Sequence, residues 1–288
     1  MTVAILGTGR MGSAVARRLS SFGLKLVLWN RTRDRAARLR LGAVAPTPAD
    51  AVARADLVLS SLTGPEAVRD VFLGSNGALE AAVQQLFIEM STAGPGVILE
   101  LDAATRKKGV RLLDAPIFGS PQAIETGDAW LFVGGSQQDV DRARPVLEML
   151  GTIRHAGKLG AGSRLKLIAN SMLASTHAVT AELMGAGLAL GLDRETVFSA
   201  LSLQAPYLTS RRTGYAEGQF ADPLFSLRDL LKDLNLSIDN FIEVRASTPV
   251  IERVREVINE SVTTVGSMDL SALVTRYVRS DTRRGVNS

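Results

Sequence analysis

The chain has 288 residues, 46% of them hydrophobic and 22% charged, with a formal net charge of +4 at pH 7. This length is sufficient for two domains, and these fractions are typical of a soluble globular protein, expected in the cytoplasm, with no apolar run long enough to cross a membrane. The absence of cysteine and the presence of only two histidines exclude disulfides and thiolate chemistry and predict no metal site.

A glycine-rich segment near the N-terminus carries the first functional signal. Gly7, Gly9 and Gly12 follow the apolar run Thr2–Leu6 and precede a helical stretch at Ser13–Ser21. In this spacing the first glycine permits a tight turn, the second lets a pyrophosphate approach, and the third lets the helix pack closely. The phosphates then meet free N–H groups at the helix start. We therefore expect a dinucleotide to contact Gly7, Thr8, Gly9, Arg10, Met11 and Gly12.

Strands and helices are expected to alternate through the first half of the chain. The expected strands are Val3–Leu6, Lys25–Trp29, Leu57–Ser61, Gln85–Glu89, Arg111–Asp114, Trp130–Val133 and Thr152–His155. The expected helices are Met11–Ser21, Arg33–Leu41, Pro48–Arg54, Gly64–Phe72, Ala78–Ala82, Val97–Lys108 and Gln137–Leu150. This alternation predicts parallel βαβ units and an α/β, doubly wound Rossmann sheet.

The pattern becomes entirely helical in the second half. Apolar residues recur at helical spacing from Ser163 to Gly191, a longer run than a typical globular helix. Further helices are expected at Leu192–Leu203, Ser226–Glu243, Thr248–Asn259 and Ser271–Arg279, followed by a polar tail that we predict to be disordered. We therefore expect a Rossmann domain at 1–161, a long connecting helix, and an all-α domain at 162–288.

The end of the second expected strand indicates which dinucleotide binds. An NAD site usually has Asp or Glu here for the ribose hydroxyls, and such a carboxylate repels a 2′-phosphate. This chain has the uncharged Asn30, followed by Arg31 and Thr32, which offer a guanidinium and a hydroxyl to a phosphate. The sequence therefore favours NADP over NAD, although Arg31 as a solvated loop residue is the alternative.

A lysine and an asparagine lie where the long helix begins. Lys166 and Asn170 are one helical turn apart, so both project from the same face, and the residues between them are mostly apolar. Spacing alone leaves two interpretations open: both side chains face water, or both line a site.

The order of motifs along nearly the whole chain resembles that of the β-hydroxyacid dehydrogenase family. This family includes 3-hydroxyisobutyrate dehydrogenase and the glyoxylate and succinic semialdehyde reductases. The matching segments are Gly7–Gly12, Glu89-Met-Ser-Thr92, Asp114-Ala-Pro-Ile-Phe-Gly-Ser120, Gly160-Ala-Gly with Lys166 and Asn170, and Lys232-Asp233-Leu234-Asn235-Leu236.

The resemblance implies roles for these residues. Lys166 would be the catalytic residue, donating a proton to the carbonyl oxygen during reduction and removing it from the alcohol during oxidation. Asn170 would bind the substrate or orient the lysine, and Asp233 would belong to the same polar cluster. The remaining implied contacts are Phe225 at the substrate, and Leu62, Thr63, Thr92 and Lys232 at the dinucleotide.

Two departures from the family pattern concern the substrate. The loop that usually reads Ser-Gly-Gly or Ser-Gly-Ser reads Phe118-Gly119-Ser120, which removes a hydroxyl expected to contact the substrate carboxylate. Backbone N–H groups at Gly119 and Ser120 remain available for it. Of the usual two asparagines after the lysine, Ala169 replaces the first.

The predicted function is reversible hydride transfer between NADP(H) and a short carboxylate-bearing substrate. Candidates are 3-hydroxyisobutyrate, glyoxylate, succinic semialdehyde, methylmalonate semialdehyde and L-serine. Alternatives on the same architecture are an imine reductase, which usually lacks the lysine, a phosphogluconate dehydrogenase, which has a longer helical domain, and a non-catalytic dinucleotide-binding scaffold. The dispersed arginines do not favour nucleic acid as a partner. The resemblance implies a homodimer or homotetramer formed through the helical domain.

Overall fold

A computed structural model describes residues 1–278, and the predicted disordered tail lies outside these residues. The chain divides into two compact units, Met1–Ile168 and the part from Ala169 onward, which meet within one continuous helix. Each unit is described by itself.

The first unit is built on a nine-stranded sheet with the order β3-β2-β1-β4-β5-β6-β8-β7, in which β9 also pairs with β8. The strands are β1 Thr2–Leu6, β2 Lys25–Trp29, β3 Ala43–Val44, β4 Leu57–Ser60, β5 Leu86–Glu89, β6 Arg111–Asp114, β7 Ile117–Phe118, β8 Ala129–Gly134 and β9 Gly151–Gly157. The helices are α1 Arg10–Ser21, α2 Arg33–Leu39, α3 Pro48–Val52, α4 Pro65–Leu73, the 3₁₀ turn η1 Ala78–Ala81, α5 Pro95–Lys107, α6 Pro121–Thr126, α7 Gln137–Leu150 and the start of α8 Ala161–Ala189.

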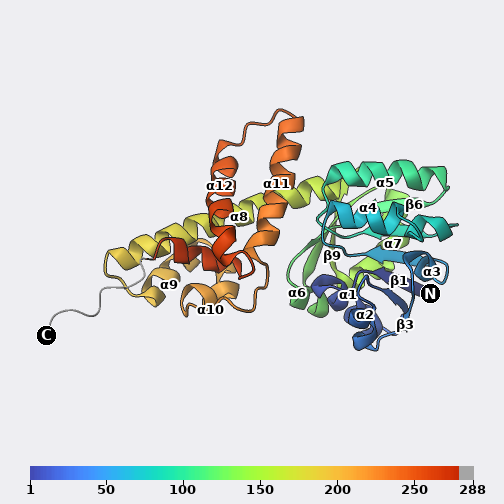
Figure 1. The fold of residues 1–288 in the computed structure, drawn as a ribbon, viewed down its shortest axis with the longest axis horizontal. Coiled ribbons are helices and arrows are strands. Elements are labelled where there is room, and N and C mark those ends of the chain that lie inside the picture. Colours follow the sequence, from blue (N-terminus) through green and yellow to red (C-terminus); the bar gives the residue numbers. More distant parts are fainter. Residues whose placement is uncertain (279–288) are drawn as a thin grey trace. The chain divides into compact units, whose positions relative to one another are not determined.

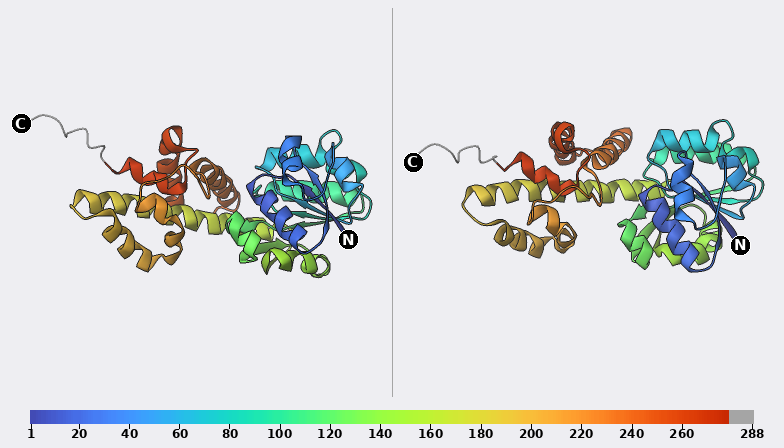
Figure 2. Two further views of the ribbon diagram at one scale, coloured as in Figure 1. Left: turned by 90° about the horizontal axis from the view of Figure 1, so that it is seen from below. Right: turned by 60° about the horizontal axis from the view of Figure 1, so that its bottom comes forward.

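Helices cover both faces of this sheet, as Figures 1 and 2 show. In β1, Val3 and Ile5 join one core with α1, α6 and α7, while Ala4 and Leu6 join a second core with α3, α4 and α5. The strands are apolar on both sides because successive side chains point to opposite faces and both faces are buried. The doubly wound α/β fold predicted from the sequence is confirmed.

The sequence predicted parallel βαβ units, and one side of the sheet also contains antiparallel pairs. β8 runs antiparallel to β6 and to the two-residue strand β7, whereas β1 to β6 are parallel. Only two residues separate β6 from β7, and both strands pair with β8, so the chain continues in one direction along β8. The sequence analysis also missed β3, β7 and α6, which are too short to show a periodic pattern.

The second unit is entirely helical. The rest of α8 is followed by α9 Arg194–Gln204, the 3₁₀ turn η2 Pro206–Arg211, α10 Arg212–Tyr215, α11 Leu227–Glu243, α12 Pro249–Val265 and the 3₁₀ turn η3 Leu270–Arg276. In Figure 2, α9 lies on one side of α8, and α11 and α12 lie on the other. Two predictions are corrected: the segment after Leu270 is 3₁₀ rather than α-helical, and α12 continues beyond Asn259.

The core of the helical unit surrounds the fully buried Tyr215. Its ring stacks on His177 with centroids 5.9 Å apart, and the Tyr215 hydroxyl lies 2.8 Å from His177 Nδ1. Within residues 1–278, the helices fall short of the length and apolarity that a bilayer crossing demands.

Candidate active site

The glycine-rich turn after β1 has the geometry that a dinucleotide requires. Gly7 has φ +97°, and a Cβ there would lie 2.2 Å from the carbonyl oxygen of Ser61. A Cβ on Gly12 would lie 2.0 Å from the carbonyl oxygen of Gly7. Gly9 differs, because no atom lies within 4 Å of the position that its Cβ would take. Two glycines therefore fit against protein, while the middle one faces open space at the start of α1.

The segment after β2 lies beside this turn. The backbone N–H of Thr8 donates to Asn30 Oδ1 at 3.0 Å, and Asn30 Nδ2 donates to the Thr32 carbonyl at 2.9 Å. Asn30 therefore connects the glycine-rich turn to the segment that leads into α2. The buried Thr8 hydroxyl has no hydrogen-bond partner within residues 1–278.

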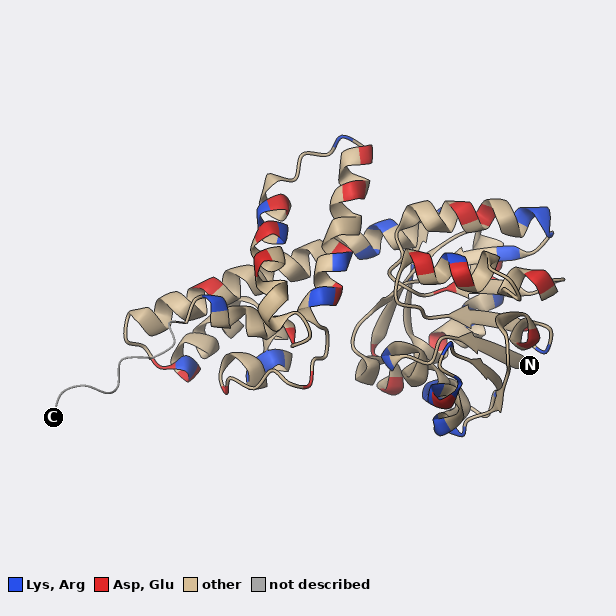
Figure 3. Cartoon of the chain, viewed as in Figure 1, with Lys and Arg blue, Asp and Glu red and all other residues tan. Residues whose placement is uncertain are grey.

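Unpaired arginines surround α2. The Arg31 side chain is exposed and forms no hydrogen bond or ion pair with the described part of the chain. The same holds for Arg33, Arg35, Arg38 and Arg40, whereas Asp34 is the one acidic residue of α2. Figure 3 shows these basic positions in blue around the helix. The region is suited to an anionic group.

A buried glutamate organises the loops after β4 and β5. Glu89 ends β5, is fully buried, and accepts hydrogen bonds from the N–H and hydroxyl of Ser91. The Ser91 oxygen in turn accepts the backbone N–H of Leu62 at 2.7 Å. Burial raises the pKa of Glu89 to about 7, which the hydrogen bonds from Ser91 oppose. Thr63 is exposed and Thr92 half-buried beside this network.

A second buried carboxylate fixes the start of α8. Asp114, the last residue of β6, accepts the backbone N–H of Gly160 at 2.7 Å and that of Ser163 at 2.6 Å. Gly160 directly precedes α8 and Ser163 lies in its first turn, where backbone N–H groups have no intrahelical acceptor. Burial raises the pKa of Asp114, and the two N–H bonds oppose the rise. The strand end therefore sets the position of the helix that carries Lys166.

We expect Asp114→Asn to lower kcat by about ten-fold and the unfolding free energy by ~1–3 kcal/mol, because the new amide N–H₂ faces a backbone donor. Asp139→Asn is the matched control. Asp139 is also a buried carboxylate at a helix start, in the first turn of α7, and it accepts a hydrogen bond from the Ser136 hydroxyl. Steady-state kinetics and urea unfolding of both variants give the comparison. Equal loss of kcat in the two variants would show that Asp114 stabilises the fold only.

Lys166 is buried, with 8% of its surface exposed. The other predicted cationic site residues of the first unit, Arg10 and Arg31, are exposed. Its Nζ lies 5.2 Å from the centroid of the Phe118 ring. Phe118 stacks on Phe132, with centroids 5.5 Å apart and an interplanar angle of 24°. The interpretation that Lys166 simply faces water is therefore wrong. Phe118 takes the position of the usual loop serine and brings an aromatic face toward the ammonium.

The rest of the substrate loop has a partly structural role. Gly119 is exposed with φ +148°. The Ser120 hydroxyl accepts the backbone N–H of Ala123 at 3.1 Å and so caps α6. The sequence analysis proposed backbone contacts at Gly119 and Ser120, and the cap uses only the side-chain oxygen of Ser120.

In the helical unit, Asn170 and Asp233 form a buried pair. Asn170 Nδ2 donates to Asp233 Oδ2 at 2.5 Å, and Lys232 Nζ lies 2.6 Å from Asp233 Oδ1. Asn170 Oδ1 is buried and has no partner within the described chain. Phe225 packs against the core of this unit. The structure thus brings together Asn170 of α8 and Asp233 of α11, which the resemblance placed in one polar cluster, and adds Lys232, which the resemblance assigned to the dinucleotide.

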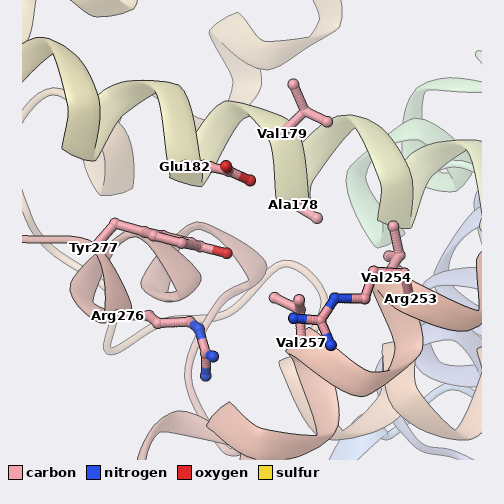
Figure 4. A pocket seen from close by; sticks show the side chains of 8 residues that line it. All are labelled: Ala178, Val179, Glu182, Arg253, Val254, Val257, Arg276 and Tyr277. Carbon is pink, nitrogen blue, oxygen red and sulfur yellow. The ribbon is translucent and has the colours of Figure 1, made fainter. Parts of the chain in front are cut away.

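A pocket of about 300 Å³ also lies in the helical unit (Figure 4). Glu182, Arg253 and Tyr277 direct polar groups toward it in this view, and Ala178 and Val254 add apolar surface. It starts two turns along α8 from Asn170, and none of the predicted site residues lines it. We assign it no part in the chemistry.

Sequence reasoning gave no role to the residues that support the site. Glu89 and Asp114 were noted only as parts of motifs, and Phe132 and Trp130 were noted only as strand residues. The signal for the first two was a carboxylate at the end of an otherwise apolar strand. Among residues 1–278 there is no group of three or more His, Asp or Glu side chains placed to bind a metal.

Comparisons with known proteins cover both units. Residues 2–160 match the family model for the NAD binding domain of 6-phosphogluconate dehydrogenase, and residues 160–277 match that for the NAD-binding region of NADP-dependent 3-hydroxyisobutyrate dehydrogenase. A 3-hydroxyisobutyrate dehydrogenase of Pseudomonas aeruginosa is 32% identical over 271 residues, covering 86% of this chain and 88% of that protein.

Solved structures agree with this match. A Mycobacterium tuberculosis 3-hydroxyisobutyrate dehydrogenase, solved with L-serine, has a TM-score of 0.85 and 28% identity, covering 96% of this chain and 98% of that one. An imine reductase of Myxococcus stipitatus, solved with NADP⁺, has a TM-score of 0.63 and 23% identity, covering 97% and 100%, and therefore shares the fold.

Proposed function

The chain belongs to the β-hydroxyacid dehydrogenase family of NAD(P)-dependent oxidoreductases acting on CH–OH donors, and we propose that it uses NADP(H) on a hydroxy acid and its carbonyl partner. One observation carries the proposal. Asp114 anchors the helix that bears Lys166 at the carboxyl ends of the parallel strands, the same edge from which the glycine-rich turn emerges. Ligands of such sheets bind at that edge.

The first unit fits a dinucleotide at this edge. The open space over Gly9 leaves room for a pyrophosphate, and the buried Thr8 hydroxyl is an unused polar group beside it. The N–H groups at the start of α1, a helix of 12 residues, would bind the phosphates. Leu62 and Thr92, fixed through Ser91 and Glu89, would line the remainder. The reduced nicotinamide supplies the hydride when bound.

The space over Gly9 leads to a matched pair of variants. We expect Gly9→Val to fold normally and to raise the Kd for NADPH more than about ten-fold, because the new side chain occupies space the pyrophosphate needs. Gly12→Val places a side chain against the Gly7 carbonyl and should destabilise the fold. Thermal unfolding and NADPH fluorescence titration measure the two effects. Unchanged NADPH affinity in Gly9→Val would contradict this placement.

Coenzyme choice would depend on Arg31 and Thr32. Asn30 is already bonded to Thr8 and Thr32, whereas the Arg31 guanidinium is unpaired and exposed beside it. We expect Arg31→Ala to raise the KM for NADPH about ten-fold and to leave the KM for NADH within about two-fold, since only NADPH carries the 2′-phosphate. Arg40→Ala, at the far end of α2, is the control. Equal changes for both coenzymes would contradict the assignment.

Lys166 would move the proton. As the carbonyl is reduced, its ammonium would donate a proton to the oxygen and stabilise the developing negative charge. In the reverse direction the neutral amine would accept the alcohol proton. Asn170, whose Oδ1 lacks a partner, would accept a hydrogen bond from a substrate hydroxyl, and Asp233 would fix the orientation of its amide.

The helical unit also supports the expected self-association. Met172, Val179 and Leu183 are exposed and recur on one face of α8, and the exposed Leu190 directly follows the helix. A contiguous exposed apolar stripe of this kind is typical of a protein–protein contact. We propose a second copy of the chain as its partner.

The proposed reaction is tested by absorbance at the NADPH band with short aldehydes, keto acids and hydroxy acids. We expect coenzyme-dependent turnover of at least one acid-bearing carbonyl compound, with Lys166→Ala inactive at unchanged coenzyme affinity. Tight NADPH binding without turnover of any compound, or turnover of imines alone, would overturn the proposed function.

A further inference from the structure

Three aromatic side chains share one face of the β7–β8 pair. Phe118 lies directly opposite Trp130 in the antiparallel register, and Phe132 follows Trp130 by two residues. Cross-strand partners and residues two apart point to the same side of a sheet. The Phe118 and Phe132 rings are stacked. We call Phe118, Trp130 and Phe132 the aromatic strip.

The aromatic strip is not part of the core of the first unit. On the opposite face of β8, Ala129, Leu131 and Val133 are fully buried in the main core. Trp130, in contrast, is 46% exposed, and Phe118 and Phe132 are partly exposed. The aromatic strip therefore exposes apolar side-chain surface, and these side chains do not contribute to the core that stabilises the sheet.

The aromatic strip begins at the reactive lysine. Gly134 lies two residues beyond Phe132 on the same face, and a Cβ there would lie 2.9 Å from the backbone nitrogen of Gly162 in α8. The first turn of α8 therefore packs at one end of the strip. From that helix the Lys166 ammonium reaches the face of Phe118. A molecule reacting at Lys166 would have the strip as its neighbour.

The chemistry of the aromatic strip selects its occupant. Ring faces carry partial negative charge, and the indole N–H of Trp130 is the one hydrogen-bond donor among the three side chains, so the ring faces disfavour a carboxylate and favour apolar or aromatic groups. The serine hydroxyl that the family pattern would place at position 118 is absent. The substrate carboxylate would therefore bind other hydrogen-bond donors. The aromatic strip would contact the part of the substrate that does not react.

We propose that the aromatic strip is a subsite for an aryl or extended apolar substituent of the substrate. This inference rests on the proposed function for the position of the reacting carbon at Lys166. The preferred substrate is then a hydroxy acid or carbonyl acid bearing such a substituent, rather than the shortest members of the class.

Non-reacting acids test the subsite without turnover. Isothermal titration calorimetry would compare 3-phenylpropanoate with propanoate on the full chain in the presence of NADP⁺. We expect 3-phenylpropanoate to bind at least about ten-fold more tightly, because its ring buries apolar surface on the strip. Phe118→Ser should reduce this ratio to within about two-fold. Trp130→Ser, at an exposed position, should lower it too, and serves if Phe118→Ser fails to fold.

A matched control is available in the same unit. Phe22 is 51% exposed, and the Arg18 guanidinium lies 4.9 Å from its ring centroid, so it reproduces an aromatic–cation contact elsewhere. Phe22→Ser should retain the full preference for 3-phenylpropanoate.

Three results would overturn the subsite. Equal affinity of the wild type for the two acids would do so, as would an equal loss of preference in Phe22→Ser. Loss of self-association in Phe118→Ser or Trp130→Ser, without a change in the affinity ratio, would assign the strip to a second copy of the chain. Failure of the proposed function would instead appear as absent turnover, which this binding ratio does not measure.

Discussion

Lys166→Met is expected to lower kcat by about 10²- to 10⁴-fold, the usual contribution of a positioned general acid or base. The methionine side chain keeps the length and apolar contacts of lysine but has no proton to donate. Because the Lys166 ammonium faces the ring of Phe118, which we place at the substrate, the Kd for NADPH should change little. Steady-state kinetics and NADPH fluorescence titration measure the two quantities.

Lys158→Met is the matched control for this variant. Lys158 is exposed and lies just before α8, where only its backbone carbonyl contacts the helix start. Its removal should leave kcat within about two-fold of the wild type, as expected of a surface substitution. Retention of more than about a tenth of the wild-type kcat in Lys166→Met would show that another group or water supplies the proton.

Glu89→Gln is expected to change how stability depends on pH. The pKa of Glu89 is raised from 4.5 to about 7 in the folded protein, so the folded state binds more protons than the unfolded state between these values. Stability contributed by the neutral carboxyl is therefore lost as pH rises through about 7. A shift of this size corresponds to about 3 kcal/mol. The variant, which stays neutral, should lack this loss.

Urea unfolding from pH 5 to pH 8.5 in the wild type and Glu89→Gln tests this. His177 acts in the opposite direction, because burial lowers its pKa to about 3 and stability is lost as pH falls below its unfolded value of 6.5. This contribution is common to both proteins, so the difference between their curves reports Glu89. If the unfolding free energies of the wild type and Glu89→Gln changed in parallel with pH, the Glu89 carboxyl would already be charged in the folded protein at pH 5.

The sequence was sufficient to predict the elements that have strong local signals. The strands of the first unit that alternate with helices were found because each is an apolar run bounded by turn residues, and α8 was found because its periodicity is long. The glycine spacing predicted the turn after β1, where two of three glycines do have backbone oxygens in the way of a side chain.

The rest depends on contacts between residues far apart in the chain. Asp114 bonds to N–H groups 46 and 49 residues away, and Asn170 bonds to Asp233 across 63 residues. No local pattern encodes these pairs. The antiparallel direction of β8 likewise follows from pairing with β7, a strand of two residues.

Phe118 shows how a departure from a family pattern gains meaning from structure. In the sequence it appeared as the loss of a hydroxyl expected to contact the substrate carboxylate. In the folded chain the ring stacks on Phe132 and faces the Lys166 ammonium, so one substitution alters both the environment of the lysine and the surface offered to the substrate. Asp114 holds the start of α8 through the backbone N–H groups of Gly160 and Ser163.

Transfer of deuterium from NADPH labelled at C4 of the nicotinamide to the product would show most directly that this chain catalyses hydride transfer to a carbonyl carbon. Each of the two C4 stereoisomers of the labelled coenzyme would be incubated with the best carbonyl substrate, and the alcohol analysed by mass spectrometry. We predict that one stereoisomer alone gives an alcohol with one deuterium on the former carbonyl carbon, at a rate that Lys166→Met reduces. An alcohol free of deuterium from both stereoisomers would contradict direct hydride transfer.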